Sequence, residues 1–250
     1  MKQFLGDFLI LGPEDEEKGN HIMTVNVDMK ALLEAGAHFG HKTSRWHPKM
    51  APYIHSKRQE AHIINLEKTV DGLNEALPKL TEIAKSGKKI LFVGTKKQMK
   101  EAVKEAAESV NMPYVVVRWV GGTLTNVETV NRQIKKLKDL ERRMASGELE
   151  NRYSKLEVQR FQEEIDLLNE RYGGIKEMSE QPAAIIVVDA CEDKNAIKEA
   201  KTLNIPVFAL TDTNVDPTNI DYVIPCNDDS VKATRLMLDY FTEAIKEGKK

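Results

Sequence analysis

Short runs of apolar, mostly β-branched residues alternate with amphipathic segments along most of this chain. The runs are HIINL, KILFVG, YVVV, AAIIVV, PVFAL and YVIP, between about residues 63 and 225. They show no polar alternation, which is typical of strands buried on both faces of a sheet. Segments near residues 69–85, 98–110, 195–203 and 230–246 have helical spacing, and all but the last precede another run. This order predicts an α/β fold with a parallel sheet and helices on both faces.

The connection between YVVV and AAIIVV is too long for a simple crossover, at about sixty residues. Apolar residues recur in it at steps of three or four on both sides of Ser146-Gly147, namely Val127, Val130, Ile134, Leu137, Leu140 and Met144, then Val158, Phe161, Ile165, Leu168 and Tyr172. The pattern predicts an antiparallel helical hairpin over residues 126–172, with an a/d seam and arms of roughly 30 Å. Its first arm is rich in cations, which fit either a docking element or a solvated face: Arg132, Lys135, Lys136, Lys138, Arg142 and Arg143.

The hairpin divides what we expect to be one α/β domain, formed by residues 23–125 and 173–250. A chain of 250 residues with 41% hydrophobic residues can bury a core of that size. Residues 1–22 are interpreted as an extension, either poorly ordered or due to an upstream start, because acidic EDEEKGN follows the short apolar run. Neither a signal peptide nor a membrane anchor is predicted. Cys191 and Cys226 follow apolar runs and are expected to be reduced, as in cytosol.

Charge is unevenly distributed, although the formal net charge of −2 gives no overall attraction to nucleic acid. Residues 42–58 hold five cations and no acid, and residues 88–104 hold six cations and one acid, whereas residues 189–229 hold nine acids and three bases. The first basic stretch overlaps AGAHFGHKTSRWHPKMAPYI, residues 35–54, where aromatic side chains are interspersed irregularly among cations. Its spacing fits neither a strand nor an amphipathic helix. Such a loop suits a polyanion with exposed bases.

Two further loops follow predicted strands and carry groups that bind phosphate or stack on bases. GTKK, residues 94–97, could hold a phosphate with its backbone and lysines, but it lacks the spacing of a nucleotide-binding motif. RWVGGTLTN, residues 118–126, offers a guanidinium, an indole, two glycines and hydroxyl groups. For each residue alone, a structural role such as a core Trp119 or a Gly121-Gly122 turn is an equal alternative.

Several acids also follow strands, and they allow a metal site. His41 precedes the sheet, while Asp212 and the pair Asp228-Asp229 follow two successive strands, so these four side chains could meet at one sheet edge and bind zinc or magnesium. The alternative is that these acids, like Asp193, cap helices. We find no Ser-His-Asp order, no HExxH and no nucleophile elbow, so catalysis is not predicted.

These motifs, taken together and in order, resemble one family. AGAHFGHKTSRWHPKMAPYI, HIINLEKT, ILFVGTKKQ, RWVGGTLTN, VVDACEDKNAIKEA, IPVFALTDTNVDP and DYVIPCNDD are similar to the second protein of the bacterial small ribosomal subunit, from Met23 to about Lys246. The leader, His47 and Cys191 depart from the family pattern. The resemblance implies a flavodoxin-like, doubly wound α/β domain with a helical hairpin, and a cytoplasmic, non-enzymatic protein that needs no cofactor. It also implies binding to small-subunit ribosomal RNA between head and body, and help in anchoring the OB-repeat ribosomal protein one.

We therefore expect a structural RNA-binding protein without a membrane or small-molecule partner, and a nucleotide- or metal-dependent α/β enzyme is the alternative. The residues expected to contact RNA lie in the basic loops and at the hairpin base: His38, His41, Lys42, Arg45, Trp46, Lys49, Lys57, Arg58, Lys96, Lys97, Arg118, Trp119, Asn126, Arg132, Lys135 and Lys136.

Overall fold

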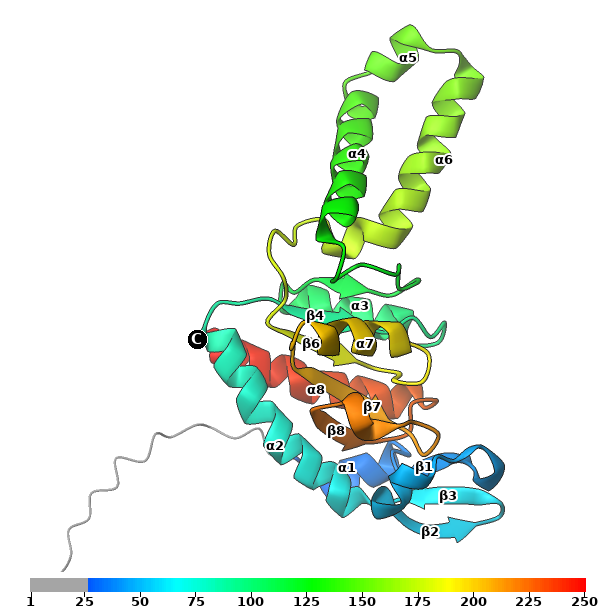
Figure 1. The fold of residues 1–250 in the computed structure, drawn as a ribbon, viewed down its shortest axis with the longest axis vertical. Coiled ribbons are helices and arrows are strands. Elements are labelled where there is room, and N and C mark those ends of the chain that lie inside the picture. The colour runs from blue at the N-terminus through cyan, green and yellow to red at the C-terminus, as the bar shows by residue number, and fades with distance from the viewer. Residues whose placement is uncertain (1–26) are drawn as a thin grey trace, which may run out of the picture.

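The centre of the molecule is a parallel five-stranded sheet in the order β5-β4-β6-β7-β8 (Figure 1). The computed structural model describes residues 27–250, so the predicted extension at residues 1–22 lies outside the described residues. The strands are β4 (Ile90–Val93), β5 (Tyr114–Val115), β6 (Ala184–Val187), β7 (Val207–Thr211) and β8 (Tyr222–Pro225). Counted along the sheet, this is the 2-1-3-4-5 order of a flavodoxin-like fold. The predicted fold class is confirmed.

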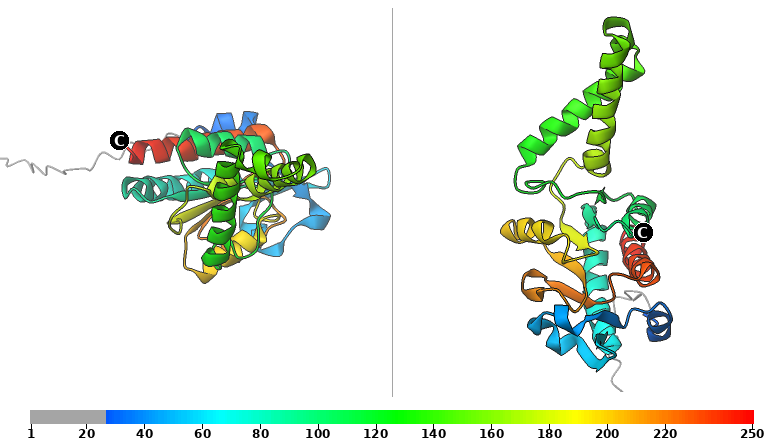
Figure 2. Two further views of the ribbon diagram at one scale, coloured as in Figure 1. Left: turned by 90° about the horizontal axis from the view of Figure 1, so that it is seen from above. Right: turned by 90° about the vertical axis from the view of Figure 1, so that its right-hand side faces the viewer.

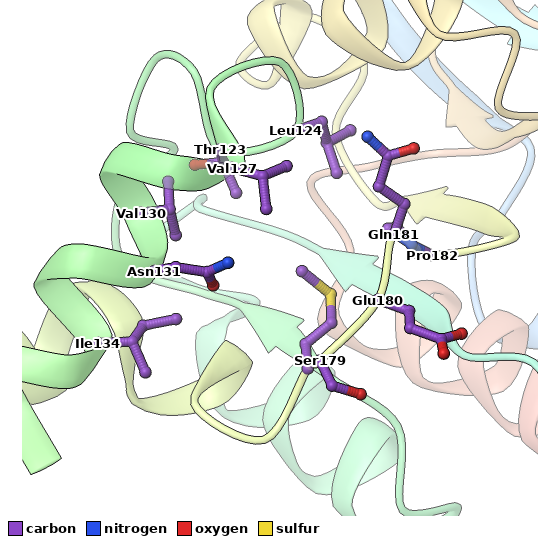
Figure 3. Close-up of a pocket in the computed structure, with 11 residues that line it drawn as sticks. Thr123, Leu124, Val127, Val130, Asn131, Ile134, Ser179, Glu180, Gln181 and Pro182 are labelled. Atoms are coloured by element: carbon purple, nitrogen blue, oxygen red, sulfur yellow. The ribbon is translucent and has the colours of Figure 1, made fainter.

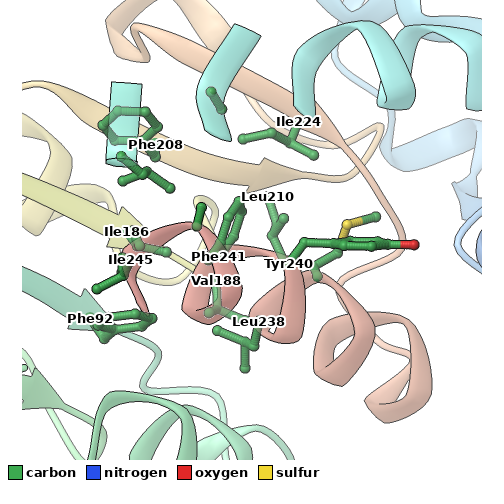
Figure 4. Packing of buried hydrophobic residues seen from close by; sticks show 14 of the residues in the cluster. Phe92, Ile186, Val188, Phe208, Leu210, Ile224, Leu238, Tyr240, Phe241 and Ile245 are labelled. Atoms are coloured by element: carbon green, nitrogen blue, oxygen red, sulfur yellow. The ribbon is translucent and has the colours of Figure 1, made fainter. Parts of the chain in front are cut away.

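Helices cover both faces of this sheet, which is why its central strands are apolar without alternation. One face packs against α2 (Leu66–Lys85), α3 (Lys100–Ser109) and α8 (Val231–Gly248), around Phe92, Ile186 and Phe208 (Figures 2 and 4). The other face packs against α7 (Lys194–Thr202) and the foot of the hairpin. Alternate residues of each strand therefore enter two separate cores, and burial of both sets stabilises the sheet.

The predicted helices all exist, with ends that differ by a few residues. Helix α2 begins earlier than predicted because the Asn65 side chain accepts a hydrogen bond from the Glu67 amide at 2.9 Å. Helix α8 is capped by Ser230, whose hydroxyl accepts from the Ala233 amide at 3.3 Å. Among the described residues, no helix combines the length and the apolarity that crossing a membrane requires.

The assignment of HIINL to the parallel sheet is wrong. Strand β3 (Ala61–Ile64) lies in a separate antiparallel sheet of order β1-β3-β2, with β1 (Phe39–Lys42) and β2 (Ile54–Arg58); we call it the small sheet. Only Ile64 of β3 is fully buried, so this run lacks the two covered faces of a central strand. Gln59 and Glu60 form the β2–β3 turn with φ of 47° and 65°, which residues other than Gly or Asn seldom adopt.

The hairpin rises from the edge of the sheet that carries β5 (Figure 1). It consists of α4 (Val127–Ala145), α5 (Glu148–Arg152) and α6 (Lys155–Tyr172), followed by the short helix η3 (Gly173–Ile175). The turn after Ser146 therefore contains an unpredicted helix, which Gly147 permits by taking φ of 71°. Seven predicted seam residues are buried, namely Val130, Ile134, Leu137, Leu140, Ile165, Leu168 and Tyr172. A regular coiled-coil seam and the domain boundaries remain predictions.

Candidate nucleic-acid interface

The small sheet is fixed to the end of β7 by hydrogen bonds from its first strand. The His41 amide donates to Asp212 Oδ1 and to Thr213 Oγ1, both at 3.0 Å, and the His47 amide donates to the Thr213 carbonyl at 2.7 Å. Gly40 permits this approach, because a Cβ there would lie 2.7 Å from Thr213 Cγ2. The segment that the sequence presented as an irregular loop is thus held rigidly at the carboxyl edge of the main sheet.

Four of the five early cations are exposed and free of acidic partners. Within residues 27–250, Lys42, Arg45, Lys57 and Arg58 form no ion pair. Lys49 differs, because its Nζ lies 3.2 Å from Asp216 Oδ2 and donates to Thr218 Oγ1 at 2.6 Å. The small sheet and the turn after β1 therefore carry four positive charges that no acidic side chain within residues 27–250 pairs with.

Aromatic side chains accompany these cations. Trp46 is 38% exposed and Phe39 is 52% exposed, which is unusual for rings of this size. The His38 ring packs on Phe39 with centroids 4.1 Å apart, and burial lowers the pKa of His38. His38 is therefore a neutral support for Phe39 rather than a further positive charge.

Lys96 does not contribute to the positive surface, because three carboxylates surround it. Its Nζ lies 2.8 Å from Asp228 Oδ1, 2.7 Å from Asp229 Oδ1 and 3.3 Å from Asp189 Oδ2. These ion pairs speak against the predicted contact between Lys96 and RNA, because the lysine already neutralises acids of its own chain. Lys97, next in the chain, is exposed.

The predicted group of His41 and three acids does come together at the same sheet edge. His41 Nδ1 lies 2.9 Å from Asp212 Oδ2, and His41 Nε2 lies 3.5 Å from Asp229 Oδ2. One ligand atom each of His41, Asp212 and Asp228 lie within 4.8 Å of one another. Asp228 is buried, and its Oδ2 atom has no hydrogen-bond partner in the described chain. The two aspartates do not cap α8, since Ser230 does.

Burial and charge displace the pKa values of this group. The hydrogen bond with Asp212 raises the pKa of His41 above its ordinary value. Burial, with Asp189 and Asp212 nearby, raises the pKa of Asp228 to about 7 despite its contact with Lys96. His41 and Asp228 therefore bind their protons more tightly than usual, because several carboxylates lie close together at this sheet edge.

The loop at residues 118–126 is organised by one carboxylate that the sequence did not single out. Glu199 of α7 accepts hydrogen bonds from Trp119 Nε1 at 3.0 Å and from the amides of Gly122, Leu124 and Thr125 at 2.8, 3.0 and 3.3 Å. These bonds outweigh burial and lower the pKa of Glu199. The loop therefore has one fixed conformation around an ionised carboxylate.

Trp119 belongs to the core and is not available to a base. It is 8% exposed and packs in the same cluster as the hairpin foot, and this burial speaks against its predicted contact with RNA. Arg118 is exposed at the start of the loop. Asn126 accepts from the Thr129 amide at 3.3 Å and caps α4.

Along α4, the predicted RNA-contact cations differ in their surroundings. Arg132 donates to Thr129 Oγ1 at 3.1 Å, and Lys135 is exposed without an ion pair in the described residues. Lys136 is paired with Glu164 of α6 across the hairpin. Only part of the basic arm is thus free for a polyanion.

A small apolar cavity lies where the hairpin meets the body (Figure 3). Leu124, Val127, Val130 and Ile134 line it together with the segment from Met178 to Pro182. Its volume of about 20 Å³ holds little more than a water molecule, far below the size of a substrate pocket.

Comparison with known proteins decides the family. The profile of the family described as "Ribosomal protein S2" matches residues 32–248. The chain belongs to this family. It is 48% identical over 223 residues to "Small ribosomal subunit protein uS2" of Roseiflexus castenholzii, covering 89% of this chain and 84% of that protein. It is 49% identical over 222 residues to the protein of the same name from Chloroflexus aggregans, covering 89% and 93%.

Membership of the S2 family confirms three predictions from the sequence. The family resemblance was correct, the protein is a structural and non-enzymatic component of translation, and its place is the cytoplasmic ribosome. A family of this kind requires no cofactor.

Proposed function

We propose that the chain binds small-subunit ribosomal RNA through the small sheet and the neighbouring loops. The observation that carries this proposal is the set of four exposed cations, Lys42, Arg45, Lys57 and Arg58, that have no ion pair within the described residues. An RNA backbone supplies the missing negative charge, and counterion release from it drives association.

Other predicted contact residues support the same surface. Exposed Lys97, Arg118, Arg132 and Lys135 extend the positive charge toward the hairpin. His41 belongs to strand β1 of the small sheet, and His38 directly precedes this strand. Lys49, Lys96 and Lys136 are held by acids of the chain itself, and Trp119 is buried, so these four contribute little to RNA affinity.

A salt titration tests this proposal. Each phosphate contact contributes about −1 to the slope of log affinity against log salt concentration, so replacing Lys42, Arg45, Lys57 and Arg58 by Ala should flatten the slope by up to about 4. Lys49→Ala is the matched control, since Asp216 already neutralises this lysine. Unchanged slope and affinity for small-subunit ribosomal RNA in the fourfold variant would reject the assignment.

We further propose that the protein lies between head and body of the subunit and helps to anchor the OB-repeat ribosomal protein one, as the family resemblance implies. An apolar surface suits such a protein contact: α1 (Met29–Glu34) leaves Met29 and Leu33 44% and 52% exposed. Val231, at the start of α8, is 40% exposed. It lies close to α1, since the preceding residue, Ser230, donates from its Oγ to the Ala35 carbonyl at the end of α1 at 3.0 Å. Apolar side chains favour protein over RNA as the partner here.

A divalent cation between His41, Asp212 and Asp228 is a second proposal. It is supported by the buried Asp228 Oδ2 atom, which has no hydrogen-bond partner within residues 27–250. The mixed nitrogen and oxygen ligands favour zinc over magnesium. Since zinc binds the neutral imidazole and Asp212 raises the pKa of His41, affinity should increase as pH rises from 6 to 8.

Metal analysis after mild dialysis, and zinc calorimetry at both pH values, check this site. The wild-type protein should retain about one ion, and Asp212→Asn should lose it. Asp216→Asn, a change to an exposed carboxylate near His47, is the control. Absence of bound ion from the wild-type protein would exclude the site.

A further inference from the structure

We propose that Trp46 stacks on an unpaired base of the RNA, so that the small sheet recognises a loop, bulge or single strand rather than a regular duplex. This inference rests on the proposed RNA binding and specifies which form of RNA the surface takes.

Trp46 is presented to solvent from a fixed backbone. It lies between two 3-10 helices, η1 (Thr43–Arg45) and η2 (Pro48–Tyr53). The next residue, His47, is hydrogen-bonded to the Thr213 carbonyl, and Met50 of η2 is fully buried. Binding at Trp46 therefore requires little ordering of the chain, which is the condition for an efficient stacking platform.

The inner side of Trp46 packs against a neutral ring. The centroids of Trp46 and His62 are 5.2 Å apart with an interplanar angle of 43°. Burial, and then the charge of Lys57, lower the pKa of His62. Trp46 thus rests on an uncharged support and keeps part of its own surface free.

His62 also has unused hydrogen-bonding capacity. Both ring nitrogens are buried and have no hydrogen-bond partner among residues 27–250. Because both nitrogens are covered, a nucleotide that stacks on Trp46 does not reach them, and His62 contributes through its contact with the Trp46 ring.

Two cations lie close to Trp46 and His62, one in the sheet register and one in the sequence. Lys57 lies directly opposite His62 in the β2–β3 register, so its side chain leaves the same face of the small sheet, and Arg45 precedes Trp46. Both are exposed and unpaired in the described chain. Duplex RNA hides its base faces, so only unpaired nucleotides can use a ring and two cations together.

The experiment compares a single-stranded oligoadenylate with a blunt RNA duplex that carries the same number of phosphates. The chain has two tryptophans, and Trp119 is buried, so quenching of intrinsic fluorescence reports on Trp46. The single strand should quench emission and the duplex should not. Trp46→Ala should weaken single-strand binding about 5- to 150-fold and leave duplex binding unchanged, whereas Trp46→Phe should retain most of it.

Two controls separate stacking from other effects. Tyr153→Ala removes a ring at the hairpin tip that is 38% exposed, like Trp46. It should change neither the affinity for the single strand nor that for the duplex. Lys57→Ala should weaken the binding of both the single strand and the duplex. Circular dichroism of each variant checks that it is folded.

The outcomes distinguish this inference from the function on which it rests. If the wild-type protein binds neither the oligoadenylate, nor the duplex, nor ribosomal RNA, the proposed function itself fails. If RNA binds but Trp46→Ala has no effect, or weakens both RNAs equally, base stacking is rejected and RNA binding stands. If Trp46→Ala leaves both RNA affinities intact but weakens incorporation into small subunits, Trp46 contacts a protein instead and the inference is wrong.

Discussion

Glu199 shows how one side chain sets the conformation of a whole loop. Its carboxylate receives hydrogen bonds from three backbone amides and the Trp119 indole, so the loop from Arg118 to Asn126 is held around a single charge. Charge-assisted bonds of this kind are roughly twice as strong as neutral ones. Through these hydrogen bonds Glu199 positions the backbone of the loop.

Replacement of this carboxylate should be costly. Glu199→Ala leaves several inward-facing amides without an acceptor, so the free energy of unfolding should fall by about 2–3 kcal/mol, as measured by urea denaturation. Glu199→Gln keeps one acceptor oxygen and should lose less. Lys198→Ala, an exposed change on the same helix, is the control. A loss below about 0.5 kcal/mol in Glu199→Ala would show that the loop is held by other contacts.

The pairings of Glu199 and Lys96 could not be predicted from the sequence. Lys96 and Asp228 are 132 residues apart in the sequence, and Glu199 is 74 to 80 residues away from the loop residues that it binds. The sequence placed Lys96, Asp212 and Asp228 at strand ends correctly, because strand ends of a parallel sheet share an edge. It could not show which cations would be neutralised there, since that depends on side-chain reach in three dimensions.

The buried strands could be predicted from the sequence, whereas the exposed strands could not. The strands β4, β6 and β7 were evident as apolar runs because both of their faces are covered. Strands β1 and β2 are largely exposed, and β1 ends and β2 begins next to a 3-10 helix, so their residues show no period. The β2–β3 turn at Gln59-Glu60 contains neither Gly nor Asn, and no turn signal marked it.

The hairpin is an element that the domain should be able to lose. Its arms pack on each other through α4 and α6, while Leu124 and Ile175 at its foot remain to cover the sheet. Replacing residues 126–172 by a short Gly/Ser linker should leave a cooperatively folded α/β domain, by circular dichroism and thermal unfolding, and should weaken incorporation into small subunits. Loss of all cooperative unfolding would place the hairpin in the core instead.

For the whole molecule, the edge of the sheet where related folds bind ligands is occupied by the chain itself. Ligands of doubly wound sheets bind outside the carboxyl ends of the strands. Here the small sheet is bonded to that edge through His41 and His47, and Lys96 lies among its acids. In this chain, the attachment of the small sheet therefore takes the place of a nucleotide crevice.

This arrangement predicts that the free protein binds no common nucleotide. Phosphates brought to this edge would meet Asp189, Asp228 and Asp229, whose negative charge repels them, and the small sheet leaves no room beside β7. Isothermal titration with ATP, GTP, NAD and FMN should give no stoichiometric heat at micromolar affinity. A control titration with ribosomal RNA should give heat that decreases with salt. Stoichiometric binding of any of the four nucleotides would mean that the edge opens, and that the small sheet is a movable cover rather than a fixed part of the fold.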